Sequence, residues 1–138
     1  MKAFVSWSSG KDCMYALYRF LKNPENKAAC LLNMSDAGND KGAIIDSGVF
    51  GDIYLQEHCT WIERVCCNTD ISAVFPLWGA DRSALIGEFV ADGFKAITVF
   101  ARKQKLPQSF TGRLIDNYFL TDMHAFPAAD PSGENNMF

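Results

Sequence analysis

The chain has 138 residues, of which 49% are hydrophobic, and it carries a formal net charge of −3. This length accommodates one domain with a substantial core, and the hydrophobic content argues against a disordered chain. Nucleic-acid binders usually present a basic face, so the acidic balance also argues against a nucleic-acid partner.

Neither a membrane segment nor a metal-binding pattern is evident in the sequence. No run approaches the roughly 20 consecutive apolar residues that span a bilayer, and the first residues lack the apolar core of a signal peptide. The five cysteines contain no C-x-x-C pair and form no zinc pattern with His58 and His124. We therefore expect a cytoplasmic protein with reduced thiols and no membrane partner.

Short apolar, β-forming runs alternate with amphipathic segments along the chain. The expected strands cover residues 3–7, 27–34, 49–54, 73–79 and 95–101. The first expected helix carries apolar residues from Cys13 to Leu21, and the second carries Leu55, Cys59, Ile62 and Cys66 on one face. This alternation predicts parallel strands that are joined by helices.

Two further helices are expected in the second half of the chain. Asp81 is a suitable N-cap for one of them, and Gly93 is a suitable residue at its C-terminal end. The other covers residues 109–123, and we expect Leu114, Tyr118 and Phe119 to point inward from it.

The element order is typical of an α/β fold, in which helices cover both faces of a mostly parallel sheet in a three-layer, Rossmann-like sandwich. We expect a single domain over residues 1–138. Ligands of such sheets gather at the carboxyl ends of the strands. The segments expected at that edge are "SWSSGKDC" (6–13), "GDIYLQEH" (51–58), "PLWGADR" (76–82) and the loop after Ala101.

The octapeptide "SWSSGKDC" has the composition of a phosphate-binding turn. Small residues let a phosphate approach the backbone amides of a helix start, and Lys11 adds a positive charge. The G-x-x-x-x-G-K-[ST] pattern fails because Val5 and Asp12 occupy two required positions, and G-x-G-x-x-G fails because only Gly10 is present. A capped helix start without any ligand is the alternative interpretation.

Five stretches resemble the diphthine–ammonia ligase family, a group of ATP pyrophosphatases with an adenine-nucleotide alpha-hydrolase-like PP-loop domain. "SSGKDC" is similar to the S-G-G-x-D-S loop of these enzymes, with Ser9 in place of the first glycine and Cys13 in place of the last serine. The matching stretches, in order, are "SWSSGKDCMYAL", "VFGDIYLQEHCTWIERVC", "FPLWGADRSALIGEFVADGFKAITV", "SFTGRLID" and "DPSGEN".

The resemblance implies an ATP-dependent ligase. Family members transfer AMP from ATP to a carboxylate with release of pyrophosphate, and ammonia then displaces AMP to form an amide. In the ligase proper, the carboxylate belongs to diphthine on elongation factor 2. The resemblance thus implies ATP and Mg²⁺ as cofactors, with AMP, ammonia and a possible protein substrate as partners.

The resemblance also implies roles for individual residues. Lys11, Asp12, Glu134 and Asn135 would be catalytic, and Asp12 would also be a ligand of Mg²⁺. Gly133, Glu134 and Asn135 would face the carboxylate or the ammonia. The nucleotide would be bound by Ser8, Ser9, Gly10, Lys11, Asp12, Cys13, Gly51, Asp52, Trp78 and Gly79.

Several of these positions also have a purely structural interpretation. Cys13 is interpreted as a packed replacement for serine. Asp52 and Glu57 can line the site together with His58, or His58 can be a solvated helix-start residue. Trp78 can shape the pocket wall or pack at a strand exit, and Asp130 can be an exposed tail residue.

The chain departs from the family pattern in two places. Residues 40–48 replace a helix, a strand and a further helix, and a parallel crossover needs about a dozen residues or more, so we expect a shortened sheet with an edge open to homodimer formation. The family motif G-E-N-G-E-[FY]-H-T is represented by "GENNMF", with Met137 in place of the second glutamate. A catalytically impaired ATP- or AMP-binding module, acting as a sensor or subunit, is therefore the alternative function. A third possibility is a remnant that only supports a partner chain.

Overall fold

The computed structural model describes residues 1–8, 10–32 and 46–133. Residue contacts divide the chain into two compact units, Met1–Gly79 and Ala80–Phe138. Each unit is described below by itself, and the single-domain organisation stays a prediction. No helix within the described residues is long and apolar enough to cross a membrane.

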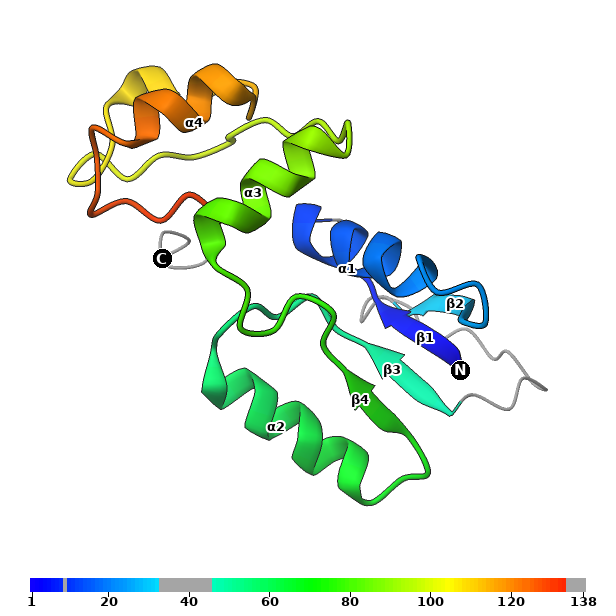
Figure 1. Cartoon of the computed structure of the whole chain (residues 1–138). Helices are drawn as coiled ribbons and strands as arrows, with labels where there is room; N and C mark the ends of the chain where they lie inside the picture. Colours follow the sequence, from blue (N-terminus) through cyan, green and yellow to red (C-terminus); the bar gives the residue numbers. More distant parts are fainter. Residues whose placement is uncertain (9, 33–45, 134–138) are drawn as a thin grey trace. The chain divides into compact units, whose positions relative to one another are not determined.

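The first unit is an α/β unit with a parallel sheet (Figure 1). Its elements are β1 (Lys2–Ser6), α1 (Lys11–Leu21), β2 (Lys27–Leu32), β3 (Ser47–Val49), α2 (Gln56–Cys67) and β4 (Ser72–Val74). The four strands are all parallel and lie in the order β2-β1-β3-β4. The predicted α/β class with a parallel sheet is therefore confirmed.

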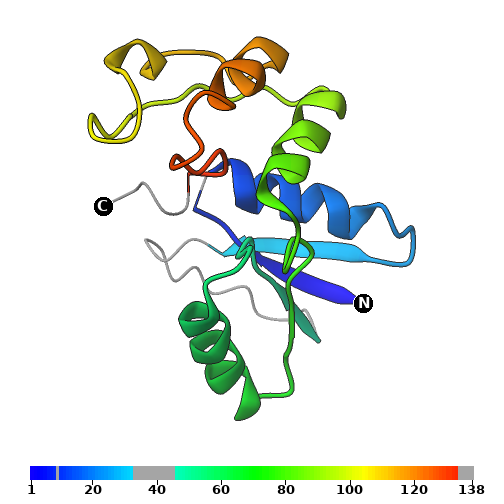
Figure 2. The same cartoon turned by 60° about the vertical axis from the view of Figure 1, so that its left-hand side comes forward.

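Helices α1 and α2 lie on opposite faces of this sheet, as both views show (Figures 1 and 2). On α2, the predicted apolar positions Cys59, Ile62 and Cys66 are buried. The central strand β1 has Ala3 and Val5 fully buried at alternate positions, as one face of a strand requires.

Strand β3 lies earlier in the chain than predicted. The expected strand was residues 49–54, whereas the structure ends the strand at Val49. A Cβ atom on Gly48 would lie 2.6 Å from the Phe4 ring, so a glycine is needed where the rings of Phe4 and Phe50 pack edge to face with centroids 5.8 Å apart. The search for apolar β-formers missed this strand because its small residues accommodate neighbouring aromatic rings.

The second unit contains two α-helices and a 3₁₀ turn among its described residues. These elements are α3 (Arg82–Ala91), η1 (Gln108–Phe110) and α4 (Asn117–Met123). Asp81 caps α3 as predicted, and Gly93 has a φ of 85° just beyond its end. The core of the unit consists of Ile86, Ala101, Leu106, Phe110, Ile115, Phe119, Met123 and Ala129.

The strand predicted over residues 95–101 is wrong. This segment forms a single antiparallel bridge, between Ile97 and Leu114, and it is not a strand of the parallel sheet. The Thr98 amide donates to the Arg113 carbonyl, and Gly112 donates to the Thr98 carbonyl. Val99 is 87% exposed. The apolar composition of this segment therefore did not indicate a strand, and its pairing is limited to one bridge.

The predicted helix over residues 109–123 is confirmed only in its last part, α4. Gly112 has a φ of 83°, which interrupts a helix, and Asp116 starts α4 by accepting a hydrogen bond from the Phe119 amide. Phe119 is buried as predicted. The inward positions expected for Leu114 and Tyr118 are wrong, because these side chains are 41% and 80% exposed.

Candidate functional site

The strand order creates a topological switch point between β1 and β3. From β1 the chain passes through α1 to β2 at one edge, whereas from β3 it passes through α2 to β4 at the other edge. The loops after Ser6 and Val49 therefore leave two neighbouring strands and run toward opposite edges of the sheet. In open α/β sheets, ligands bind at this position, beyond the carboxyl ends of the strands.

Helix α1 begins at this switch point without a side-chain cap. Gly10 occupies the N-cap position with extended backbone angles, φ −85° and ψ 166°. Because glycine has no side chain, it offers no oxygen to the amides of the first turn, and among the described residues no side chain caps this helix start.

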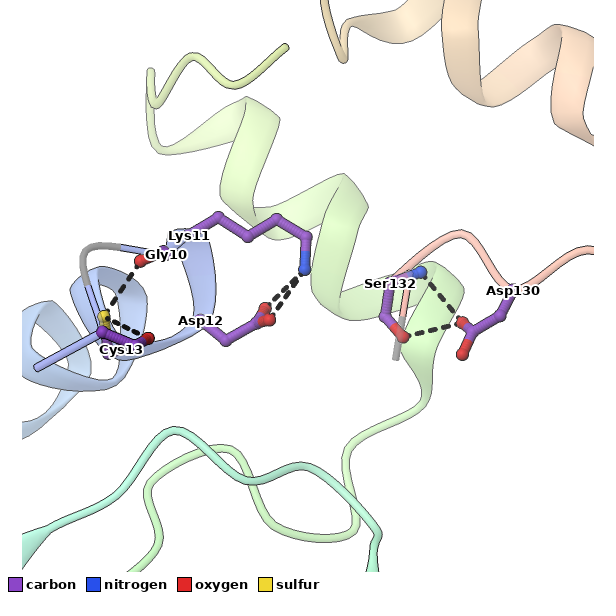
Figure 3. A network of polar contacts seen from close by, with 7 residues as sticks. Gly10, Lys11, Asp12, Cys13, Asp130 and Ser132 are labelled. Carbon is purple, nitrogen blue, oxygen red and sulfur yellow. Dashed lines mark hydrogen bonds and ion pairs between the residues drawn. The ribbon is translucent and has the colours of Figure 1, made fainter. Parts of the chain in front are cut away.

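Cys13 is a packed residue in the first turn of α1. Its thiol is buried and donates to the Gly10 carbonyl at 3.0 Å, and the Ser8 hydroxyl lies 3.6 Å from its sulfur. Figure 3 shows the Cys13 sulfur directed back toward Gly10. Cys13 and Ser8 therefore fix the turn that leads into α1, in agreement with the structural interpretation of Cys13.

Lys11 and Asp12 form an ion pair at the start of α1. The Lys11 Nζ lies 2.7 Å and 2.9 Å from the two Asp12 carboxylate oxygens (Figure 3). Both side chains are partly exposed. An anion that approached the first turn would compete with Asp12 for the ammonium group, so this pair places a cation next to the helix start before any ligand binds.

Gly51 brings the loop after β3 against the first turn of α1. A Cβ atom at this position would lie 2.8 Å from the Cys13 amide nitrogen and 2.9 Å from the Asp12 carbonyl carbon. Both contacts are with backbone, which cannot rotate away as a side chain can. Only glycine therefore permits this approach of the two segments that the sequence had assigned to one site.

Asp52 is adjacent to Gly51 and contacts α2. Its Oδ1 lies 3.2 Å from Nδ1 of His58, whose side chain is mostly exposed. Burial, reinforced by the carboxylates of Glu63 and Asp52, raises the pKa of the Cys59 thiol. The structure thus pairs Asp52 with a mostly exposed His58 at the exit of β3, which fits both interpretations of His58, and the role of the two as site residues stays a prediction.

Trp78 and Gly79 follow β4 and are joined to the loop after β3. The Gly79 amide donates to the Ile53 carbonyl at 2.8 Å, and its φ of 71° suits glycine. The Trp78 ring lies 5.8 Å from that of Phe75, at the end of a row of rings that also includes Phe50 and Phe4. Packing at a strand exit thus describes Trp78. No motif in the sequence points to this row of rings, although its residues lie in or just beyond three neighbouring strands.

The predicted residues near the C-terminus divide into two groups. Glu134 and Asn135 lie outside the described residues, as does Ser9. Asp130 is buried rather than an exposed tail residue: its Oδ1 accepts hydrogen bonds from the amide and hydroxyl of Ser132, and its Oδ2 accepts one from Arg82. Figure 3 shows the Asp130–Ser132 contacts. Only the acidic residue, not its partners, was evident from the sequence.

Asp12 is a suitable single carboxylate ligand for magnesium. Within residues 1–8, 10–32 and 46–133, no three His, Cys, Asp or Glu side chains are grouped to bind a metal ion. Mg²⁺ bound to a nucleotide commonly uses one or two carboxylates together with phosphates and water. The partly exposed Asp12 at the helix start fits that mode, and it does not fit a closed protein cage.

The chain was compared with protein-family models and with curated proteins. No family model matches it, and no curated protein matches it.

Proposed function

We propose that the chain is the ATP-binding domain of an amide-forming ligase of the diphthine–ammonia ligase type, with the adenine-nucleotide alpha-hydrolase-like PP-loop fold. The observation that carries this proposal is the start of α1 at Gly10, uncapped by a side chain, at the switch point between β1 and β3. A helix start of this kind favours a phosphate through its free amides and its dipole. The five stretches that resemble the family support the same assignment.

Three features next to Gly10 support phosphate binding. Lys11 supplies a positive charge in the first turn, and its contact with Asp12 holds it there. Gly51 allows the loop after β3 to approach the same turn without a side chain in between. Ser8 contributes a hydroxyl group close to the turn. Donors that are in position before charge develops are the main source of stabilisation in such reactions.

The proposed reaction has two steps. An oxygen of the substrate carboxylate attacks the α-phosphorus of ATP, the bond to the bridging oxygen breaks, and pyrophosphate leaves with the electron pair. The nitrogen of ammonia then attacks the acyl carbon, AMP leaves with its oxygen, and the nitrogen loses a proton to give the amide. Lys11 and the amides of the first turn would stabilise the negative charge on the departing pyrophosphate.

Magnesium would be bound by Asp12 together with the phosphates, and it would neutralise part of their charge. Asp12 would then exchange its contact with Lys11 for the metal ion. The released ammonium group would be free to contact a phosphate oxygen at the same helix start.

The test is an assay of the full chain with ATP, Mg²⁺, ammonium and a series of carboxylic acids. We expect AMP and pyrophosphate to appear in equal amounts only when an acceptor acid is present. Lys11→Gln should reduce the rate by about 100-fold, in the range observed for loss of one charge-stabilising donor. Lys27→Gln is the matched control, because this exposed lysine begins β2 at the opposite end of the sheet and should leave the rate unchanged.

Two outcomes would redirect the proposal. ATP binding without release of pyrophosphate would identify a nucleotide-binding module, which the replacement of the second motif glutamate by Met137 favours as the alternative. Absence of both binding and turnover would contradict the nucleotide proposal as a whole.

A further inference from the structure

The second unit contains a pocket of about 550 Å³. It is lined by the first turn of α3, by Lys105, by the end of α4 and by residues 126–131. Pockets that bind small molecules commonly measure about 300–1,000 Å³ and combine apolar walls with a few polar groups. The size of this pocket therefore suits a small organic ligand.

The apolar wall of the pocket is part of the core of the unit. Met123 and Ala129 are buried members of the core cluster, and Leu120 and Phe126 pack against it. Packing of this kind holds a surface in place before a ligand arrives. An apolar ligand body would exclude water from this wall and gain free energy from its burial.

The carboxylates that line the pocket are already engaged by groups of the protein. Asp81 accepts a hydrogen bond from the Ala84 amide at 2.8 Å. Asp130 is contacted by Arg82 at 2.9 Å and by the amide and hydroxyl of Ser132. Arg82 thus neutralises the charge of Asp130, whereas the Asp81 carboxylate is engaged by a neutral amide.

Lys105 is the lining cation that lacks a carboxylate partner in the described part of the chain. A turn fixes its backbone, because the amides of Lys105 and Leu106 both donate to the Arg102 carbonyl at 2.9 Å. The adjacent Leu106 is buried in the core cluster and anchors this turn. The ammonium group is therefore attached to a well-supported position in the lining of the pocket.

We infer that this pocket binds a small molecule with one carboxylate group on an apolar body. Lys105 would pair with the carboxylate, and the hydroxyl of Ser83 would be a second donor in the lining. A single uncompensated cation matches a monoanion better than a dianionic phosphate, since the second charge would lose water without gaining a partner. This inference does not depend on the nucleotide proposal, because every residue in it belongs to the second unit.

The test uses phenylacetate as the probe, with phenylacetamide as its uncharged counterpart and inorganic phosphate as the competing anion. Titration of the full chain by calorimetry or NMR should give a Kd of about 1 mM for phenylacetate, the affinity expected of so small a ligand. NMR signals of the Met123 and Leu120 methyl groups should shift on binding. Phenylacetamide and phosphate should bind at least about tenfold more weakly, a difference of about 1.4 kcal/mol.

Two variants distinguish an effect of the Lys105 charge in the pocket from an effect of any positive charge on the same loop. Lys105→Gln should weaken phenylacetate binding by about tenfold. Lys103→Gln removes the same charge from an exposed residue of the same loop that does not line the pocket, and it should have no effect. Circular dichroism would verify that both variants fold. Equal effects of the two variants, equal binding of the amide, tighter binding of phosphate, or no binding of phenylacetate at about 10 mM would each overturn the inference.

Discussion

Helices α1 and α3 begin in different ways, although each starts after a loop and each has amides without helical partners in its first turn. At α3, Asp81 is the N-cap, and its carboxylate accepts a hydrogen bond from the Ala84 amide at 2.8 Å. At α1, the N-cap is Gly10, which has no side chain to offer. A carboxylate cap occupies a first-turn amide that an anion would otherwise contact, whereas a glycine occupies none.

This difference indicates how stability and binding are distributed in the chain. Asp81 and also Asp116, which caps α4, act as local stabilisers of their helices. The start of α1 has no such side-chain cap, and it lies at the position in the sheet where α/β folds bind ligands. Without a capping side chain, this helix start contributes less local stability than the capped starts of α3 and α4.

The largest expected effect comes from Gly51→Ala. The added methyl group would lie 2.8–2.9 Å from the backbone of Asp12 and Cys13, so the start of α1 has to move. We expect a loss of about 1–3 kcal/mol in the free energy of unfolding, measured by urea denaturation, as for other overpacked sites. Gly87→Ala in α3 is the control: a Cβ there meets nothing within 4 Å, and a gain of about 0.5–1 kcal/mol is expected. Equal stability of Gly51→Ala and the wild type would contradict the close approach.

The next effect is the loss of the α3 cap in Asp81→Ala. The Ala84 amide would lose its acceptor, and the free energy of unfolding should fall by about 1 kcal/mol. Asp81→Asn retains a capping oxygen and should recover most of this loss in the same denaturation experiment. Similar losses for the alanine and asparagine variants would show that the cap contributes little.

Adding a cap to α1 should have a smaller effect of opposite sign. Gly10 has extended backbone angles that any residue can adopt, and a Cβ there would lie 3.4 Å from the Ser8 hydroxyl oxygen, an ordinary contact. We expect Gly10→Asp to raise the free energy of unfolding by about 0.3 kcal/mol, whereas Gly10→Ala should lower it because alanine is a poor N-cap. A destabilised Gly10→Asp variant would mean that the first turn has no donor available.

The smallest effect concerns Asp46, just before β3. A hydrogen bond from the Ser47 hydroxyl, followed by one from the Lys2 amide, holds the pKa of the Asp46 carboxyl below its usual value. A lowered pKa means that its contribution to stability is present above the usual value of 3.8 and is lost as the pH falls toward the folded-state pKa. Asp46→Asn should therefore reduce the pH dependence of unfolding in this acidic range. An unchanged pH profile would show that these hydrogen bonds do not persist in solution.

Periodicity and cap chemistry predicted the helices best. The buried face of α2 and the Asp81 cap of α3 follow from residue types at fixed spacing. The position of β3 did not follow, because Gly48 is required by the rings of Phe4 and Phe50 and not by any local preference. The antiparallel bridge between Ile97 and Leu114, in place of a strand over residues 95–101, also depends on a partner that a local pattern does not specify.

The candidate site was predictable in location but not in its internal contacts. The rule for strand carboxyl ends brought the start of α1 and the loop after β3 to one edge, and the approach of Gly51 to Asp12 and Cys13 agrees with it. The close approach of Gly51 to α1 and the burial of Asp130 arise from contacts between segments that are distant in sequence. In the sequence, a glycine shortly before an expected helix is the signal for a close approach of two backbone segments. Gly51, which precedes the helix expected from Leu55, is an example.

The most direct measurement is a calorimetric titration of ATP with Mg²⁺ into the wild-type chain and into Gly10→Asp. We expect the wild type to bind ATP with a Kd between about 1 μM and 1 mM, the range usual for enzyme substrates. Gly10→Asp should bind at least about tenfold more weakly while it unfolds at the same or a higher temperature, since its carboxylate both repels phosphate and occupies an amide. Equal affinities in the two proteins, or no heat of binding in the wild type, would contradict a phosphate site at the start of α1.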